Sequence, residues 1–258
     1  MAATSHADIE TALSSDVIHT APHRIYRSLR DSEPVYRSAV AGGWLVTSYD
    51  LVEEVLTDPT RFSSAGAEVE FIGRLDPGTA ESTRTLRRHF ATSQLNTSDP
   101  PDHTRIRRAF GRAFLNRSVA RYAEAITTAA DEILDDKCPA GDAMDVVGDY
   151  AEPLPVRVIS DIIGVPASHR ARIPVVTMHQ RHFFGSVVPN ESHATQFDAT
   201  LGEWHGLLAD WIDRRRREPA DDVMSRAAEV VDSGAITLDE AAATLLHFII
   251  AGNGTTTA

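Results

Sequence analysis

Apolar residues recur every three to four positions along most of the chain, the spacing that places them on one face of an α-helix. Helices are predicted over residues 22–31, 51–58, 100 to about 136 with breaks, 155–163, 167–184, 194–217, 221–231 and from 237 onward. Two short β-rich runs, 35–38 and 44–48, flank a Gly-Gly pair, which is a hairpin signal. The pattern therefore predicts a mainly α fold with a small β portion.

Residues 63–97 interrupt this pattern, since they are rich in Ser, Thr and Gly and show no sustained period. A connection of that length inside a compact domain is usually functional or mobile. The chain has no internal repeat, no low-complexity tract and no stretch typical of a linker. We therefore expect residues 1–258 to form a single domain.

Composition and charge narrow the function classes. Hydrophobic residues make up 42% and charged residues 24% of the chain, as in soluble globular proteins. The formal net charge of −12 repels phosphate backbones, so we expect no nucleic-acid partner. The most apolar stretch, 245–251, is too short to span a membrane, and the N-terminus lacks the apolar core of a signal peptide. Cys138 is the only cysteine and is interpreted as a loop residue. Because a lone thiol forms no internal disulfide and suits a reducing compartment, we expect the chain to be cytoplasmic.

The run from Asp99 to Phe114 is the first stretch with chemical content. Ser98 or Asp99 is a suitable N-cap with Pro100 at the first helical position, and the helical spacing predicts a buried stripe of Ile106, Phe110, Ala113 and Phe114. His103 and Arg107 lie one turn apart at the border of that stripe. Such a pair is suited to a buried anion, which is either a ligand carboxylate or a protein Asp or Glu.

Three arginines of the same run, Arg105, Arg108 and Arg112, are predicted on the opposite side of the helix. They form either a basic docking face on an acidic protein or an ordinary solvated helix face.

The run from Thr237 to Ala258 is the second such stretch. Thr237 and Glu240 have the spacing of a capping box, and the helix becomes apolar on all sides from Leu245. Gly252 and Gly254 then disfavour helix. Either the helix ends at one of these glycines, or a flat group approaches its backbone. The glycine spacing fits neither nucleotide-binding fingerprint.

Taken together, the two stretches resemble bacterial cytochromes P450. Residues 99–107 resemble the C-helix signature of that family, and 251–256 resemble its oxygen-binding I-helix motif, Ala-Gly-x-acid-Thr-Thr. Residues 22–36, 46–64 and 153–166 resemble the A-helix, B-helix and E-helix regions in the same order. The resemblance covers about residues 22 to 258 and implies a P450 fold whose cofactor is haem.

The resemblance also implies roles for individual residues. His103 and Arg107 match the positions that hold the haem propionates, and Ala251 and Gly252 match the place where the I helix lies against the haem. Thr255 matches the catalytic threonine that helps to deliver protons to dioxygen.

The resemblance to cytochromes P450 also implies which residues line the substrate pocket. His247 and Ala251 match positions that line the substrate pocket, although His247 is equally consistent with a buried histidine bonded to a neighbour. Residues 63–97 match the variable loop over that pocket, and 183–192 match its lid. No resident metal site is expected: His179 and His182 lie three apart on a helix, but no third ligand is apparent.

Two departures from the family pattern bear on function. Gly254 stands where the family has an acidic residue that takes part in the proton relay. The family's Glu-x-x-Arg pair and haem-ligating cysteine lie beyond the I helix, whereas this sequence stops at Ala258, and Cys138 lacks the glycine-rich ligand loop. We therefore expect an incomplete P450 domain that exposes apolar residues such as Phe248 and Ile249 and is prone to aggregate.

The function implied by the resemblance is that of a haem-thiolate monooxygenase. It would insert one oxygen atom of O2 into a small organic substrate, with electrons from NAD(P)H delivered by a ferredoxin-type partner. Arg105, Arg108 and Arg112 are the candidate docking residues for that partner. The alternative function is a non-catalytic helical domain that binds haem weakly, or a ligand without turnover.

Overall fold

A computed structural model describes residues 5–15, 17–114, 122–139 and 143–257. The first part of the chain contains α1 (His6–Leu13), α2 (Val17–Thr20), α3 (Pro22–Ser32), β1 (Val35–Ser38), β2 (Gly43–Val46), α4 (Tyr49–Thr57), α5 (Ala67–Ile72), α6 (Pro77–Ser82) and α7 (Arg84–Ala91). The second part contains α8 (Asp102–Gly111), the 3₁₀ turn η1 (Arg112–Phe114), α10 (Ala123–Lys137), the π-helical η2 (Val146–Ala151), α11 (Pro153–Ile163), the 3₁₀ turn η3 (Ala167–Arg172), α12 (Ile173–Phe184), α13 (Glu191–Arg217), α14 (Val223–Asp232) and α15 (Leu238–Thr257). The mainly α fold with a small β portion is confirmed.

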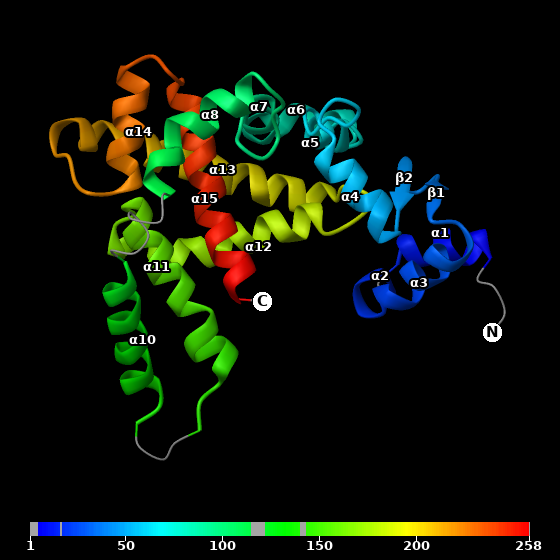
Figure 1. Ribbon diagram of the computed structural model, residues 1–258, viewed down its shortest axis with the longest axis horizontal. Coiled ribbons are helices and arrows are strands. Elements are labelled where there is room, and N and C mark those ends of the chain that lie inside the picture. The colour runs from blue at the N-terminus through cyan, green and yellow to red at the C-terminus, as the bar shows by residue number, and fades with distance from the viewer. Residues whose placement is uncertain (1–4, 16, 115–121, 140–142, 258) are drawn as a thin grey trace.

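The larger hydrophobic core surrounds α13 and α15. α13 is 27 residues long and buries one stripe at helical spacing, made of Phe197, Leu201, Trp204, Leu208 and Trp211. It lies beside α12, and α15 crosses both helices and packs against α11 (Figure 1). Ile249 is fully buried on α15, and Phe248 is partly buried, so the expected exposure of Ile249 is wrong. In the described part of the chain no helix is both long and apolar enough to cross a bilayer.

A smaller core holds the N-terminal helices on the hairpin. Ile9, Ile25, Leu29 and Tyr36 form its centre. β1 and β2 pair antiparallel with Val35 opposite Val46, as the Gly-Gly signal predicts, and Gly42 takes the left-handed conformation in the turn, with φ of 66°. The Glu10 carboxylate accepts hydrogen bonds from the Tyr36 hydroxyl at 2.8 Å and the Val40 amide at 2.8 Å, which ties α1 to the hairpin.

The prediction that residues 63–97 form a loop is wrong, since α5, α6 and α7 lie within this segment. Each of these helices has only six to eight residues, too few for a period to stand out. α6 has a local start signal, because Asp76 accepts hydrogen bonds from the Gly78 and Thr79 amides and Pro77 occupies the first position.

The start of α8 also differs from the prediction. The helix begins at Asp102, after a cis bond between Pro100 and Pro101, and not at Pro100. The Asp99 side chain accepts hydrogen bonds from the Ser63 hydroxyl and the Ser64 amide instead of capping the helix. Asp99 thus joins the 63–97 segment to α8.

Candidate functional site

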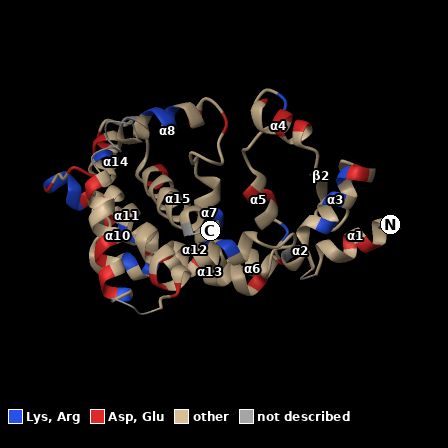
Figure 2. Cartoon of the chain, turned by 60° about the horizontal axis from the view of Figure 1, so that its bottom comes forward, with Lys and Arg blue, Asp and Glu red and all other residues tan. Residues whose placement is uncertain are grey.

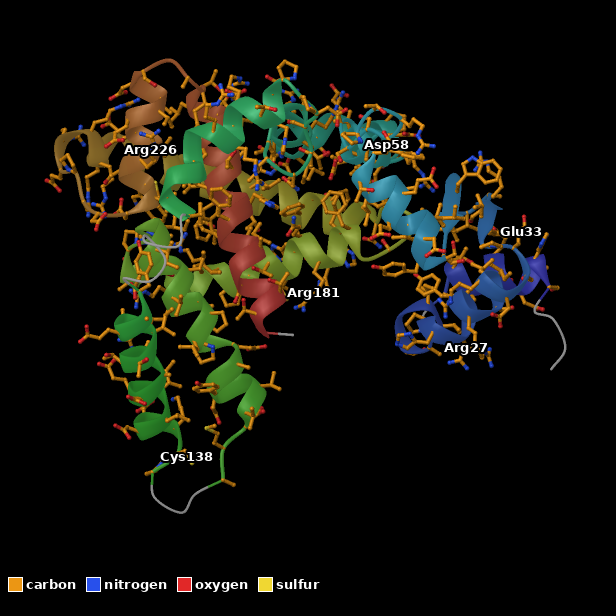
Figure 3. All side chains as sticks on the ribbon, viewed as in Figure 1. Arg27, Glu33, Asp58, Cys138, Arg181 and Arg226 are labelled. Carbon is orange, nitrogen blue, oxygen red and sulfur yellow. The ribbon has the colours of Figure 1, made fainter. Side chains whose placement is uncertain are left out.

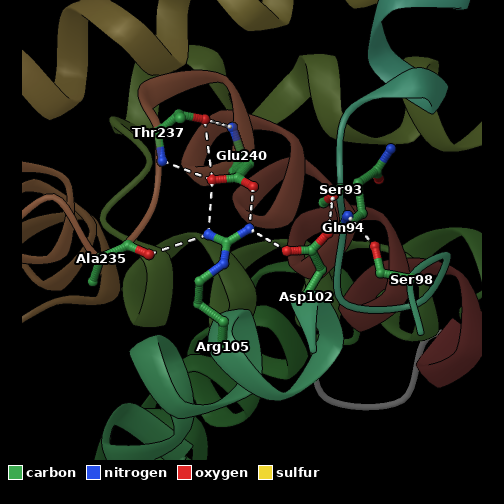
Figure 4. Close-up of polar contacts among 8 residues, drawn as sticks. All are labelled: Ser93, Gln94, Ser98, Asp102, Arg105, Ala235, Thr237 and Glu240. Carbon is green, nitrogen blue, oxygen red and sulfur yellow. Dashed lines mark hydrogen bonds and ion pairs between the residues drawn. The ribbon is translucent and has the colours of Figure 1, made fainter. Parts of the chain in front are cut away.

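Arg105 joins α8 to the beginning of α15 (Figure 4). Its guanidinium donates to both carboxylate oxygens of Glu240, at 3.0 and 2.5 Å, and to Asp102 Oδ1 at 2.8 Å. It also donates to the Ala235 carbonyl at 3.1 Å. Two parallel bonds between a guanidinium and a carboxylate are a strong and directional contact. Arg105 was predicted on an outward basic face; its side chain is partly exposed, but its guanidinium is held by the carboxylates of Asp102 and Glu240.

Glu240 serves the capping box and the ion pair together. Its Oε2 accepts from the Thr237 amide at 2.7 Å, and its own amide donates to the Thr237 hydroxyl at 3.2 Å, which confirms the predicted box. Burial alone would raise the pKa of Glu240, but hydrogen bonds from Arg105 and Thr237 outweigh it and lower that pKa below its ordinary value. The carboxylate therefore stays charged at neutral pH.

Replacing Arg105 with alanine is expected to destabilise the fold by about 2 kcal/mol, because it leaves the Glu240 carboxylate, only 10% exposed, without its cation. Arg108→Ala is the matched control, since Arg108 is exposed on the same helix and its loss should change stability by less than ~0.5 kcal/mol. Urea unfolding followed by circular dichroism measures both. Equal midpoints for the two variants would contradict the anchoring role.

His103 and Arg107 lie on the side of α8 that carries Phe110. They share a stripe with Phe110, at positions i, i+4 and i+7, and the Phe110 ring lies 5.6 Å from that of Phe248 on α15. His103 is half-buried and Arg107 is exposed, and neither forms an ion pair with a protein carboxylate among the described residues. The two side chains thus present an imidazole and a guanidinium on the side of α8 that carries Phe110.

The adjoining face of α15 carries the other predicted residues. His247, Ala251 and Thr255 follow one another at intervals of four, so they lie on one side of the helix. Exposure increases along this row, from half-buried His247 and Ala251 to exposed Thr255. The Thr255 hydroxyl donates to the Ala251 carbonyl at 2.7 Å. The structure thus places a threonine hydroxyl at the open end of a face that begins in the core.

The two glycines of α15 are explained by helix packing. A Cβ on Gly252 would lie 2.7 Å from Ile159 Cδ1 on α11, and one on Gly254 would lie 3.3 Å from Thr177 Cγ2 on α12. The buried Asn253 amide donates to the Thr177 hydroxyl at 3.1 Å. The helix continues through both glycines to Thr257, so the alternative of a helix stop is wrong. The Cα of Gly252 faces α11, so only the backbone of this residue can contact a ligand bound beside α15.

The remaining arginines of the predicted docking face have different positions. Arg108 is exposed and lines a groove of about 1130 Å³ between α8 and α14, while the Arg112 side chain lies outside the described residues. Figure 2 shows basic residues along α8 on this otherwise acidic protein.

A histidine cluster that the sequence analysis missed joins α7, α13 and α15. His89 Nδ1 lies 2.8 Å from His205 Nε2, and His89 also lies within electrostatic range of His247. Burial, with His205 and His247 nearby, lowers the pKa of His89 to about 3, and burial lowers those of His205 and His247 as well. All three rings are therefore neutral at pH 7. No local motif could have paired them, because their separations in sequence exceed 40 residues.

His179 has a structural partner, since its Nδ1 lies 2.7 Å from the Thr200 hydroxyl on α13. Within the described ranges no group of three or more His, Cys, Asp or Glu side chains has the arrangement to hold a metal ion.

Known proteins with related sequences and folds identify the family. No family model matches the chain. The 6-deoxyerythronolide B hydroxylase of Saccharopolyspora erythraea is 32% identical over 93% of this chain and 58% of its own length. The vitamin D(3) 25-hydroxylase of Pseudonocardia autotrophica is 32% identical over 99% of this chain and 60% of its own. Epothilone B-bound cytochrome P450epoK shares the fold with a TM-score of 0.79, at 26% identity over 95% of this chain and 60% of that one.

Sequence and fold therefore agree that the chain is homologous to the bacterial cytochromes P450. It spans about three fifths of the length of the curated relatives it matches. The relatives are named as hydroxylases, and the family is one of haem-dependent monooxygenases.

Proposed function

We propose that this chain supplies the propionate-binding and oxygen-side helices of a haem-thiolate monooxygenase. The observation that carries the proposal is the arrangement of two faces beside one contact, Phe110 on Phe248. His103 and Arg107 share the side of α8 that carries Phe110, and Ala251 and Thr255 follow Phe248 on α15 at i+3 and i+7. A single flat ligand with two carboxylates at its edge suits such an arrangement.

The donor set fits haem on the side that the chain provides. A guanidinium and an imidazole are the groups that recognise a carboxylate, so Arg107 and His103 would hold the propionates. Ala251, with the backbone of Gly252, would line the haem face. The thiolate ligand of the family has no counterpart here, because Cys138 follows α10 at the tip of the α10–α11 arm, away from α8 and α15 (Figure 3).

Haem, when bound, supplies the iron that activates dioxygen so that one oxygen atom enters a small organic substrate. The chain's own contribution is made by α15. Because the Thr255 hydroxyl donates to the Ala251 carbonyl, its oxygen keeps lone pairs that accept a hydrogen bond from water or ligand at the open end of the face. Gly254 supplies no acid beside it, so protons reach Thr255 through water or substrate.

His247 and Ala251 are the proposed substrate contacts. His247 offers a neutral ring at pH 7, because burial lowers its pKa, and a neutral imidazole both donates and accepts hydrogen bonds. We assign the docking surface for the electron donor to the basic face of α8 around the exposed Arg108, where an acidic ferredoxin would bind. Arg105 instead stabilises the fold through its ion pair with Glu240.

The propionate assignment is tested by titrating the chain with ferric haem and with haem dimethyl ester, whose carboxylates are blocked. We expect wild type to bind haem at least ~10-fold more tightly than the ester, because each charge-assisted contact to a carboxylate contributes about 1.5–3 kcal/mol. Arg107→Ala and His103→Ala should each weaken haem binding and leave ester binding nearly unchanged. The Soret band and tryptophan fluorescence report both ligands.

Arg108→Ala is the control for general loss of positive charge on α8, and it should retain the preference of wild type. If Arg107→Ala still preferred haem over the ester as strongly as wild type does, Arg107 would not contact a propionate. Saturable haem binding without oxygenation of any substrate by the complete protein would instead support the alternative of a non-catalytic haem-binding domain.

A further inference from the structure

One face of α13 holds the α6–α7 segment through three polar contacts at regular spacing. Glu191, Asp198 and His205 lie seven residues apart, so they share a side of the helix. Glu191 accepts a hydrogen bond from the Asp76 amide at 3.1 Å, Asp198 accepts one from the Leu86 amide at 2.7 Å, and His205 bonds to His89 at 2.8 Å. The same edge of the segment therefore meets the same face of α13 over four turns.

Apolar contacts lie between these three points, since Leu86 of α7 and Phe197 and Leu201 of α13 are fully buried in one core. Gly202 lies under Thr85, where an added Cβ would find ordinary van der Waals space, 3.7 Å from the Thr85 hydroxyl oxygen. The Phe90 and Phe197 rings lie 6.3 Å apart. The polar contacts thus add directional links to an apolar contact between α7 and α13.

The three contacts differ in how they respond to acid. Asp198 and Glu191 receive backbone amides, which do not titrate. In the third contact one imidazole donates and the other accepts, which requires that the accepting nitrogen carry no proton. A second proton on the accepting ring removes the bond and places a charge in the interior.

We propose that the His89–His205 pair is an acid-released latch, which holds α7 on α13 while both rings are neutral and frees it when the rings are protonated.

The charged groups around the pair favour the neutral form of His89. Arg84 and Arg88 lie on α7 beside it, and Asp239 on α15, the nearest acid, is already paired with Arg88 at 2.5 Å. His247 faces His89 from α15 and is neutral too. For His205, Asp239 favours the proton, whereas burial and Arg88 oppose it.

The sign of the pH response follows from these surroundings. In the open state both rings are hydrated and titrate near the ordinary value of ~6.5. In the closed state burial lowers the pKa of His89 to about 3. The latch is therefore fully effective above pH ~6.5, and below that value each ring that is protonated only in the open state raises the open population about tenfold per pH unit.

The consequence for ligand access rests on the proposed function. α13 packs against α15, and His247 of α15 lies within electrostatic range of His89 of α7, so release of α7 from α13 would loosen the surroundings of His247. At low pH a substrate would then bind more rapidly and also dissociate more rapidly.

Hydrogen–deuterium exchange of the purified 258-residue chain at pH 7.5 and 4.5 tests the latch without haem or turnover. After correction for the intrinsic rate, the opening of residues 84–91 should rise at least ~100-fold at pH 4.5, the effect of a single ring. Residues 208–216, in the distal half of α13, should rise far less. Equal changes in the two segments would overturn the latch and would leave the haem proposal intact.

Two variants separate the latch from general loosening. His89→Gln with His205→Gln keeps polar side chains that do not titrate, so the pH dependence of 84–91 should disappear. Asp198→Asn weakens the neighbouring anchor and should speed exchange by a similar factor at both pH values. If the double variant does not fold, the ring resonances of wild type decide: titration of His89 near pH 6.5 with no faster exchange of α7 would refute the latch.

Discussion

Replacing Gly164 with alanine is expected to destabilise the protein by ~3 kcal/mol or more, among the largest effects of any single added methyl group in this fold. Gly164 ends α11 with φ of 93°, where an L-residue is strained, and the Gly164 and Val165 amides both donate to the Ser160 carbonyl. A Cβ at this position would also lie 2.3 Å from Asp222 Oδ2. Since Asp222 is itself fixed by two partners, neither side of the contact can move freely.

Gly206→Ala is the matched control, because Gly206 lies inside α13 with no atom within 4 Å of the position of its Cβ. It should stabilise the protein by up to ~1 kcal/mol, the difference between alanine and glycine in a helix interior. Urea midpoints for the two variants should therefore shift in opposite directions. A Gly164→Ala midpoint close to that of wild type would show that α11 can end without a left-handed residue.

The sequence predicts the long elements well for a physical reason. α13 and α15 repeat their apolar positions over five or more turns, and the Thr237–Glu240 box marks the start of α15. α13 begins at Glu191, three residues before its predicted start, because Asn190 caps it. The α5–α7 segment was missed because its helices are held by tertiary contacts, such as Leu86 with Asp198, and not by a repeating pattern.

The candidate site was predicted in part. His103 and Arg107 were placed beside the core from their spacing alone, and the structure brings their stripe to α15 through Phe110. The partner of Arg105 was not predicted, because Glu240 is 135 residues away and its capping role gave no sign of a second contact. The reason for Gly252 was also hidden, since Ile159 belongs to a helix nearly 100 residues earlier.

Replacing Asp222 with alanine is expected to cost ~3–5 kcal/mol of folding free energy, the usual penalty for removing one partner of a buried ion pair. Its carboxylate is 7% exposed and accepts from Arg215 Nε at 2.8 Å and Nη2 at 2.6 Å. The other oxygen caps α14 by accepting from the Ser225 amide at 2.7 Å. Without it, the Arg215 guanidinium, 16% exposed, has lost its anion near the place where α11, α13 and α14 meet.

Asp213→Ala supplies the comparison within the same arginine-rich end of α13. Asp213 is half exposed and pairs with Arg217 at 2.7 Å, so its loss should cost less than ~1 kcal/mol. Because Gly164 and Asp222 are in contact, their effects should not add: Gly164→Ala should be less destabilising in the Asp222→Ala background, where the clash with Oδ2 is gone. Strict additivity in that double-mutant cycle would show that the cost at Gly164 comes from the backbone alone.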